Sequence, residues 1–544
     1  MEQKNQQYMD SSSGFNSLTK TFHSLRLPLN LPEEDTPLSA TEYAFSRRAN
    51  SPWPDSIALI NSSTATQPIF YSHFIQKTNS LAAYLQKVIK LSKNDVAFVL
   101  SPNSVQVPIL YFSLLSLDVI VSPANPISTE SEISRLIHLS KPVIAFATSS
   151  TVHKLPKLEH QTILIDSPEF DSVMMSSKHQ LDPVRVSQSD LAAILYSSGT
   201  TGKVKGVMLT HRNLIAQVAS YCASWQQQET PAAMLFTMPY FHVFGFLYCV
   251  RSVALSEMAV VMERFELKKM LRAVEEFRVT HTALTPPVVV AMLKDGLTDG
   301  YDLSSLEGVV CGAAPLGKDS IAAFMARFPK VVFLQSYGLT ESTAGIFRMV
   351  GLEESKHLGS VGRLSGGFEA KIVEPETGDA LPPLKQGELW IRGPTIMKGY
   401  IRDAKATSET LLKDGWMRTG DLCYIDEGGF LFIVDRLKEL IKYKGFQVAP
   451  AELEQLLLSH PEIADAAVIP YPDEEGGEVP MAFVVRQPQS QSSLNEAEIM
   501  NFVAKQVAPY KKIRRVAFVS SIPKSPAGKL LRKDLMKIAV PSRL

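Results

Sequence analysis

Cysteine is scarce in this chain of 544 residues, and the few cysteines follow no recognised pattern. The four cysteines, Cys222, Cys249, Cys311 and Cys423, form no CxxC pair and are too sparse for a disulfide framework. They also lack metal-ligand spacing with histidine, which argues against the common zinc motifs. We therefore expect four reduced thiols.

Net charge is absent as well, since 55 Lys and Arg balance 55 Asp and Glu. The even balance argues against a nucleic-acid-binding protein. A hydrophobic share of 45% is too high for a disordered chain, and 29 Gly and 34 Pro are too few for collagen-like or low-complexity classes. The length predicts two to four domains, at roughly 100–200 residues each.

Long hydrophobic runs are also missing. The longest apolar run, 109–121, contains Asp118 and lies between Pro108 and Pro123, which predicts a buried helix followed by a strand rather than a membrane span. Residues 1–27 are polar and lack the apolar core of a secretory signal, so we expect a flexible arm over 1–40.

The chain ends in Ser542-Arg543-Leu544, which is similar to the Ser-Lys-Leu type of tripeptide that the peroxisomal import receptor reads. We expect a peroxisomal location, with the cytoplasm as the alternative.

Apolar β-branched runs alternate with helical stretches through most of the chain, which predicts an α/β fold with mostly parallel sheets. We expect strands at 96–100, 119–122, 142–147 and 259–262, and helices at 74–88, 130–139 and 267–276. From Gly387 short strands with Gly-rich turns indicate a small β-rich subdomain. A charged segment at 435–439 then precedes a new α+β pattern, with helices at 451–458 and 496–506. We place a large domain over 41–434, a hinge at 435–438 and a small domain over 439–544.

One stretch departs from the charge balance. Between Ile499 and Lys533 there are nine basic residues and no acidic one. A solvated surface is the usual fate of such a run, and a surface that faces anions is the alternative.

A loop at 196–206 has the composition of a phosphate-binding loop. It follows the apolar run 191–195 and contains four Ser or Thr hydroxyls, three glycines and two lysines. Glycines let backbone N–H groups approach a polyphosphate, hydroxyls add donors and lysines add charge. It is not a Walker A loop, which would require Gly at Ser197 and Ser or Thr at Val204. A plain surface turn would not call for the two lysines.

The loop resembles the signature of the adenylate-forming superfamily, which includes acyl-CoA synthetases, 4-coumarate–CoA ligases, beetle luciferases and peptide-synthetase adenylation domains. Segments at 239–245, 312–317, 335–341, 419–421, 435–447 and 526–529 are similar to the family's further motifs, in order. The resemblance covers about residues 40–535 and is strongest to plant 4-coumarate–CoA ligase-like enzymes. It implies an ATP-dependent ligase that needs Mg²⁺ and coenzyme A and forms an acyl-adenylate, then a CoA thioester. It also implies that the small domain is mobile.

The resemblance implies the following ATP site. The phosphates would lie on Ser197, Ser198, Gly199, Thr200, Thr201, Gly202, Lys203 and Lys205. The adenylate would be lined by Ala313, Gln335, Ser336, Tyr337, Gly338 and Thr340, with Tyr337 stacked on adenine. Glu341 would bind Mg²⁺, a cation that prefers oxygen ligands, and Asp421 would accept hydrogen bonds from the ribose.

The small domain would present two faces in turn, rotating about Arg436 and Lys438. In the first step Lys529 would bridge the substrate carboxylate and the α-phosphate, with Gln447 nearby. In the second step Lys442, Lys444 and Gly445 would face the site, where glycine leaves room for pantetheine. Arg264 would contact coenzyme A, although a solvated surface position explains it equally well.

His242 resembles the family's gate beside the carboxylate; a packed core histidine and a general base are the alternatives. The acid pocket would be lined by Phe244, Tyr248, Val310, Gly312, Ser336, Ala344, Gly345 and Ile346. Most of these are apolar or small, which predicts an acid with a hydrophobic tail. Hydroxycinnamate ligases usually carry Lys in place of Val310 and often Tyr in place of Phe244. We therefore expect an acid without a para-hydroxyl: cinnamate, a medium or long fatty acid, or a cyclopentanone oxylipin precursor.

Other functions are kept as alternatives. A peroxisomal fatty-acid or oxylipin-precursor ligase fits the same motifs. A stand-alone adenylation protein that loads a carrier protein would release adenylate but make no free CoA thioester. A luciferase-like oxidation and a non-catalytic binding relative are further possibilities; the joint presence of Lys529, Glu341, Asp421 and Arg436 argues against the latter. We expect a monomer.

Overall fold

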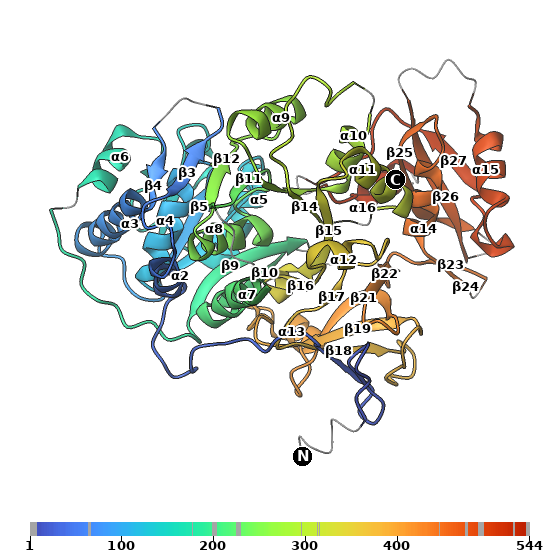
Figure 1. Cartoon of the computed structure of the whole chain (residues 1–544), viewed down its shortest axis with the longest axis horizontal. Helices are drawn as coiled ribbons and strands as arrows, with labels where there is room; N and C mark the ends of the chain where they lie inside the picture. The colour runs from blue at the N-terminus through green and yellow to red at the C-terminus, as the bar shows by residue number, and fades with distance from the viewer. Residues whose placement is uncertain are drawn as a thin grey trace.

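The computed structural model shows a large body built on three sheets and a smaller body built on a fourth (Figure 1). It describes residues 8–63, 67–176, 178–198, 204–224, 230–294, 296–312, 314, 316–444, 446–473, 477–487, 494–525 and 528–539. Among these residues, no helix is both long enough and apolar enough to cross a membrane. The mixed α/β architecture confirms the predicted fold class.

The first sheet has seven strands and ends in the hairpin that carries the phosphate loop. Its order is β20 (Gly399–Tyr400), β10 (Val204–Thr210), β9 (Leu191–Ser198), β6 (Ile120–Pro123), β5 (Val96–Leu100), β7 (Ile144–Ala147) and β8 (Ile163–Leu164). Strands β5 to β8 pair in parallel, whereas β9 and β10 are antiparallel. The helices that follow these strands or precede them are α3 (Tyr71–Tyr84), α4 (Gln106–Ser116), α5 (Glu130–Ser140), α6 (Pro168–Met175) and α7 (His211–Ser224).

The second sheet has nine strands. Their order is β17 (Arg363–Leu364), β16 (Ala344–Arg348), β15 (Val332–Leu339), β14 (Gly308–Cys311), β13 (His281–Leu284), β11 (Ala233–Phe236), β12 (Met258–Val261), β3 (Ile57–Asn61) and β4 (Ile69–Phe70). Within this sheet, the neighbouring strands β15, β14, β13, β11, β12 and β3 all pair in parallel. Its helices are α2 (Ala40–Ala49), α8 (Val243–Leu255), α9 (Leu267–Glu276), α10 (Pro286–Met292), α11 (Lys318–Arg327) and α12 (Gly351–Ser355).

The apolar run 109–121 forms the predicted buried helix and strand. Nine consecutive residues of α4, 107–115, are buried, so this helix is covered on all sides, and β6 follows after a short turn. Asp118 occupies that turn with a positive φ of 58° and is fully buried.

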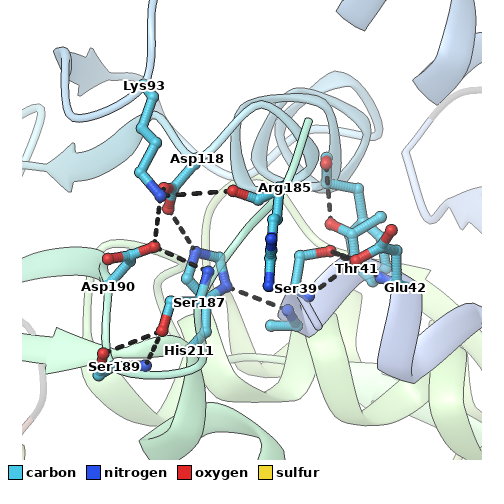
Figure 2. A network of polar contacts seen from close by, with 12 residues as sticks. Ser39, Thr41, Glu42, Lys93, Asp118, Arg185, Ser187, Ser189, Asp190 and His211 are labelled. Atoms are coloured by element: carbon cyan, nitrogen blue, oxygen red, sulfur yellow. Dashed lines mark hydrogen bonds and ion pairs between the residues drawn. The ribbon is translucent and has the colours of Figure 1, made fainter. Parts of the chain in front are cut away.

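A polar network holds Asp118 and ties the phosphate-loop hairpin to the body of the domain (Figure 2). His211 accepts a hydrogen bond from the Ala40 N–H on Nδ1 at 3.0 Å, and its Nε2 lies 3.2 Å from Asp118. Because Nδ1 is the acceptor, Nε2 carries the proton and donates a hydrogen bond to Asp118. Lys93 pairs with Asp118 at 2.9 Å and with Asp190 at 2.6 Å. Asp190 directly precedes β9 and His211 directly follows β10, so the network fixes both strands of the hairpin.

The third sheet is the β-rich subdomain predicted from Gly387 onward. Its order is β1 (Phe15–Asn16), β2 (Thr21–His23), β18 (Glu369–Val373), β19 (Gly387–Arg392), β21 (Met417–Ile425) and β22 (Leu431–Arg436), with α13 (Ala404–Thr410) beside it.

The expected flexible arm was wrong for the described residues from 8 onward. Phe22 pairs with Ala370 of β18 and is only 2% exposed, and Phe15 packs against it. Burial of these two aromatic side chains in the core of the third sheet stabilises the segment. The polar residues around them gave no indication of this burial in the sequence.

The fourth sheet belongs to the small body. It contains β24 (Phe446–Val448), β23 (Ile441–Tyr443), β26 (Gly477–Arg486) and β25 (Ile463–Asp473), with β27 (Arg515–Phe518) on β26. Its helices are α14 (Pro450–Leu458), α15 (Glu496–Ala504) and α16 (Arg532–Ala539). Strand β22 runs through Asp435 and Arg436, so these two residues of the predicted hinge belong to the third sheet. The limits at 434 and 439 remain a prediction.

Candidate active site

The parallel strands β13, β14 and β15 end at one edge of the nine-stranded sheet, where ligands of open α/β sheets usually bind. A cavity of about 60 Å³ lies there. It is lined by Met238, His242, Val243, Phe244, Ala283, Leu284, Thr285, Val310, Gly312, Ser336, Gly338, Ala344 and Gly345. This is the position in which the sequence places the acid pocket.

Two residues predicted for the pocket do not line it. Tyr248 packs behind Phe244, with ring centroids 4.3 Å apart. Ile346 is fully buried in the core cluster of the third sheet, at the irregularity where the pairing of β16 with β15 skips one residue.

His242 caps the amino end of α8 and faces this cavity. Its Nδ1 accepts a hydrogen bond from the Phe244 N–H at 3.4 Å. Burial lowers the pKa of His242 to about 4, so the imidazole is neutral near pH 7. A neutral ring whose Nδ1 is engaged can donate from Nε2 to a carboxylate, which favours the gate over the general base.

Asp421, Arg436 and Tyr337 form a buried polar triad beside the cavity. Arg436 donates from Nε to Asp421 Oδ1 at 2.9 Å, and the Tyr337 hydroxyl donates to Oδ2. Burial raises the pKa of Asp421, and the Arg436 charge opposes this. Burial, together with the Asp421 charge, also raises the pKa of Tyr337 well above its usual range. The phenol is therefore neutral, and its ring is held in one orientation.

Lys529 reaches the same place from the small body. The loop closes on itself, since the Ser525 N–H donates to the Lys529 carbonyl at 2.8 Å and the Lys529 N–H donates to Ser525 Oγ at 3.1 Å. Gly528 has a φ of 77°, and a Cβ there would lie 3.3 Å from Thr285, which lines the cavity. Burial and the nearby Arg436 charge lower the pKa of Lys529, while Glu439 and Asp421 oppose the shift.

Glu341 lies at the mouth of the phosphate-loop hairpin. Its Oε1 accepts hydrogen bonds from Ser197 Oγ at 2.9 Å and from the Tyr400 hydroxyl at 3.0 Å. Lys205 pairs across the hairpin with Ser197 and lies over the Tyr400 ring at 4.3 Å. In the described part of the chain, no hydrogen bond reaches the other oxygen, Oε2, which is available to a cation. The described residues hold no group of three or more His, Cys, Asp or Glu that could hold a metal ion.

Other predicted residues fall away from this site or outside the described part. Lys442, Lys444 and Gln447 are exposed on β23, its turn and β24, and Lys438 and Arg264 are exposed as well. Gln335 is buried and Thr340 opens the 3₁₀ turn that holds Glu341. Gly199, Thr200, Thr201, Gly202, Lys203, Ala313, Gly445, the Ser198 side chain and the terminal tripeptide lie outside the described residues.

Tyr400 and Thr285 were missed by sequence reasoning. Tyr400 reaches Glu341 only because β20 pairs with β10 across a gap of almost two hundred residues. Thr285 follows β13 directly and precedes two prolines, so its position after a buried strand was the available signal.

Comparison with known proteins decides the family. The AMP-binding enzyme model matches residues 45–401, and the AMP-binding enzyme C-terminal domain matches residues 452–529. The chain belongs to the AMP-binding enzyme family. It is an AMP-forming acid–CoA ligase.

The ligase is 52% identical to 4-coumarate–CoA ligase-like 9 of Arabidopsis thaliana, over 98% of this chain and 97% of that protein. It is 46% identical to the peroxisomal OPC-8:0-CoA ligase 1 of the same plant, over 98% of each. Among solved structures, ATP-bound MatB from Rhodopseudomonas palustris is 25% identical with a TM-score of 0.82, covering 92% of this ligase and 99% of that chain.

Proposed function

We propose that this ligase activates a hydrophobic carboxylic acid that lacks a para-hydroxyl. The observation that carries the proposal is the cavity wall. The wall includes the apolar side chains of Val310, Phe244, Met238 and Leu284. Among the described residues, no charged side chain lines the cavity. A buried hydroxyl there would lose its water without gaining a charged partner, whereas a hydrocarbon tail is favoured. The similarity to an OPC-8:0-CoA ligase supports an oxylipin-type or fatty acid as the natural substrate.

In the proposed first step Lys529 neutralises charge as the carboxylate attacks the α-phosphate. The bond between the carboxylate oxygen and phosphorus forms, and the bond to pyrophosphate breaks. An ammonium at this site stabilises the developing negative charge more strongly than it would in water, because its charge is less screened. The closeness of the neighbouring Gly528 to Thr285 and the charge interaction of Lys529 with Asp421 support this role.

Glu341 would hold Mg²⁺ together with the ATP phosphates, and Lys205 would bind a phosphate oxygen. Mg²⁺ would supply charge neutralisation for the leaving pyrophosphate. The two donors on Glu341 fix the carboxylate for this purpose. Asp421 would accept the ribose hydroxyls, and Tyr337 would stack on adenine.

In the proposed second step the thiol of coenzyme A displaces AMP. Lys442 and Lys444 are exposed in this arrangement of the two bodies, so their part requires rotation of the small domain about residues 435–438. Arg264, exposed on the large domain, would then meet a phosphate of coenzyme A. His242 would release the carboxylate to let the pantetheine arm enter.

We also propose that the ligase acts in the peroxisome, addressed by its terminal Ser-Arg-Leu through the import receptor, with the cytoplasm as the alternative. A fluorescent protein fused ahead of the chain should co-localise with a peroxisomal marker and become diffuse when Leu544 is deleted.

A panel assay tests the substrate proposal. AMP release would be followed with ATP, Mg²⁺, coenzyme A and one acid at a time. We expect kcat/KM for cinnamate or for a C8–C14 acid to exceed that for 4-coumarate at least tenfold. A clear preference for 4-coumarate would overturn the proposal.

A further inference from the structure

A second cavity, of about 430 Å³, lies between the amino-terminal segment, the end of α7 and the strands β16 and β17. These elements come together in the lower middle of Figure 1. None of its lining residues lines the acid cavity. Three arginines face it, namely Arg26, Arg348 and Arg363.

Only one of these arginines is neutralised. Arg26 pairs with Glu354 at 2.8 Å and also donates to the Arg348 carbonyl. In the described part of the chain, neither Arg348 nor Arg363 forms an ion pair with a carboxylate. The cavity therefore carries an excess of two positive charges over its single carboxylate.

The guanidinium of Arg348 is almost fully buried, yet it is only partly satisfied. Its Nη2 donates to Ser224 Oγ at 2.7 Å and to Ser220, whereas Nε and Nη1 are buried and have no hydrogen-bond partner among the described residues. Burial lowers the pKa of Arg348 to about 10, with no carboxylate to oppose it. Burying a charged group whose N–H donors lack partners destabilises the fold, unless an anion accepts hydrogen bonds from those donors.

Arg363 repeats the pattern on the neighbouring strand. Its guanidinium lies over the Phe430 ring at 4.5 Å, and its buried Nε has no partner among the described residues. Stacking holds the planar group in place and leaves its donors free, as at sites that bind carboxylate or phosphate.

Part of the remaining wall is apolar and open, beside the polar side chains of Ser13, His23 and Ser220. Leu25 and Leu27 are 40% and 73% exposed at its mouth, and Val350 and Leu364 lie further in. An alkyl chain that covers these leucines would remove apolar surface from water.

We propose that this cavity binds an amphiphilic anion, a carboxylate, sulfonate or phosphate that carries a short hydrocarbon chain, with its headgroup on Arg348 and Arg363. The site is distinct from the acid pocket. Tyr221 connects the two, because Arg348 lies over its ring at 4.4 Å and its hydroxyl would lie 3.7 Å from a Cβ at Gly345. Binding of the anion should therefore change the KM for the acid as well.

Calorimetry with octanesulfonate tests the proposal, since this probe has no carboxylate to activate. We expect one molecule to bind to the full-length protein after incubation with ATP, Mg²⁺ and a substrate acid, which fills the acid pocket and keeps the probe out of it. Arg363→Gln should weaken binding at least tenfold without a change in the rate of AMP formation. Arg278→Gln, at an exposed arginine that pairs with Asp302, is the matched control.

A second variant and two probes without a hydrocarbon chain test the same site further. Ala223→Trp fills the mouth from an exposed position of α7 and should also weaken binding; it serves in place of Arg363→Gln if that variant is unstable. Methanesulfonate and inorganic phosphate, which have the headgroup alone, should bind at least tenfold more weakly. Unchanged binding in both variants would overturn the site, as would complete loss of binding once the acid pocket is filled. Binding of phosphate equal to that of octanesulfonate would overturn the role of the apolar wall.

Discussion

Replacing Lys529 with alanine should stop the first half-reaction and spare the second. The ammonium is buried beside Asp421 and Arg436, where its charge is weakly screened. At about 4 Å and an effective dielectric constant of about 20, two unit charges interact by about 4 kcal/mol. Loss of most of that energy in the transition state corresponds to roughly a 100- to 1000-fold slower rate.

The assay is pyrophosphate release with ATP, Mg²⁺ and the best acid. Lys533→Ala, at an exposed lysine of α16 only four residues further on, is the matched control and should keep the wild-type rate. Thioester formation from a pre-made acyl-adenylate should be nearly unchanged in Lys529→Ala. A Lys529→Ala variant that releases pyrophosphate at more than a tenth of the wild-type rate would refute the reasoning.

The pH profile gives an independent check. Burial lowers the pKa of Lys529, and only the ammonium form can stabilise the developing charge. Adenylation should therefore decline as pH rises through this lowered pKa, at lower pH than the usual lysine range. A rate that stays flat up to the pKa of a free lysine would contradict this account.

Three further predictions follow from other contacts. Tyr400→Phe removes a donor 3.0 Å from Glu341 and should raise the KM for Mg²⁺-ATP about three- to tenfold, measured by steady-state kinetics; an unchanged KM would separate Tyr400 from the metal site. Val310→Lys puts an ammonium into the apolar cavity and should shift the ratio of kcat/KM values toward 4-coumarate by about tenfold or more; no shift would mean that the acid tail lies elsewhere. Asp118→Ala breaks the contacts of this buried carboxylate with Lys93 and His211 and should destabilise the large domain by about 3 kcal/mol in denaturant unfolding, whereas Asp302→Ala at an exposed pair should leave the unfolding midpoint nearly unchanged.

The sequence predicted those parts of the fold that depend on local periodicity. The apolar alternation located β5, α9 and β19 closely, and the buried run at 109–121 became α4 and β6. The amino-terminal segment was beyond such reasoning, because Phe15 and Phe22 are buried by β18, which lies some 350 residues away in the chain.

The candidate site shows the same division. The resemblance to the family's motifs predicted Asp421, Lys529 and most of the cavity residues, and the structure places Asp421 inside β21. The contact of Tyr400 with Glu341 depends on how distant strands pair, and the placement of Ile346 depends on an irregularity in the pairing of β16 with β15, which no local pattern specifies. The cavity lined by Arg26, Arg348 and Arg363 could not be predicted from the sequence for the same reason, because these arginines come from separate segments of the chain.

The most direct test of the central claim is a competition among acids. An equimolar mixture of 4-coumarate, cinnamate, C8–C14 fatty acids and a cyclopentanone acid would be incubated with ATP, Mg²⁺ and coenzyme A, and the products identified by mass spectrometry. The account predicts one AMP for each CoA thioester and a thioester pool dominated by acids without a para-hydroxyl. A pool dominated by 4-coumaroyl-CoA, or AMP formed without any thioester, would contradict it.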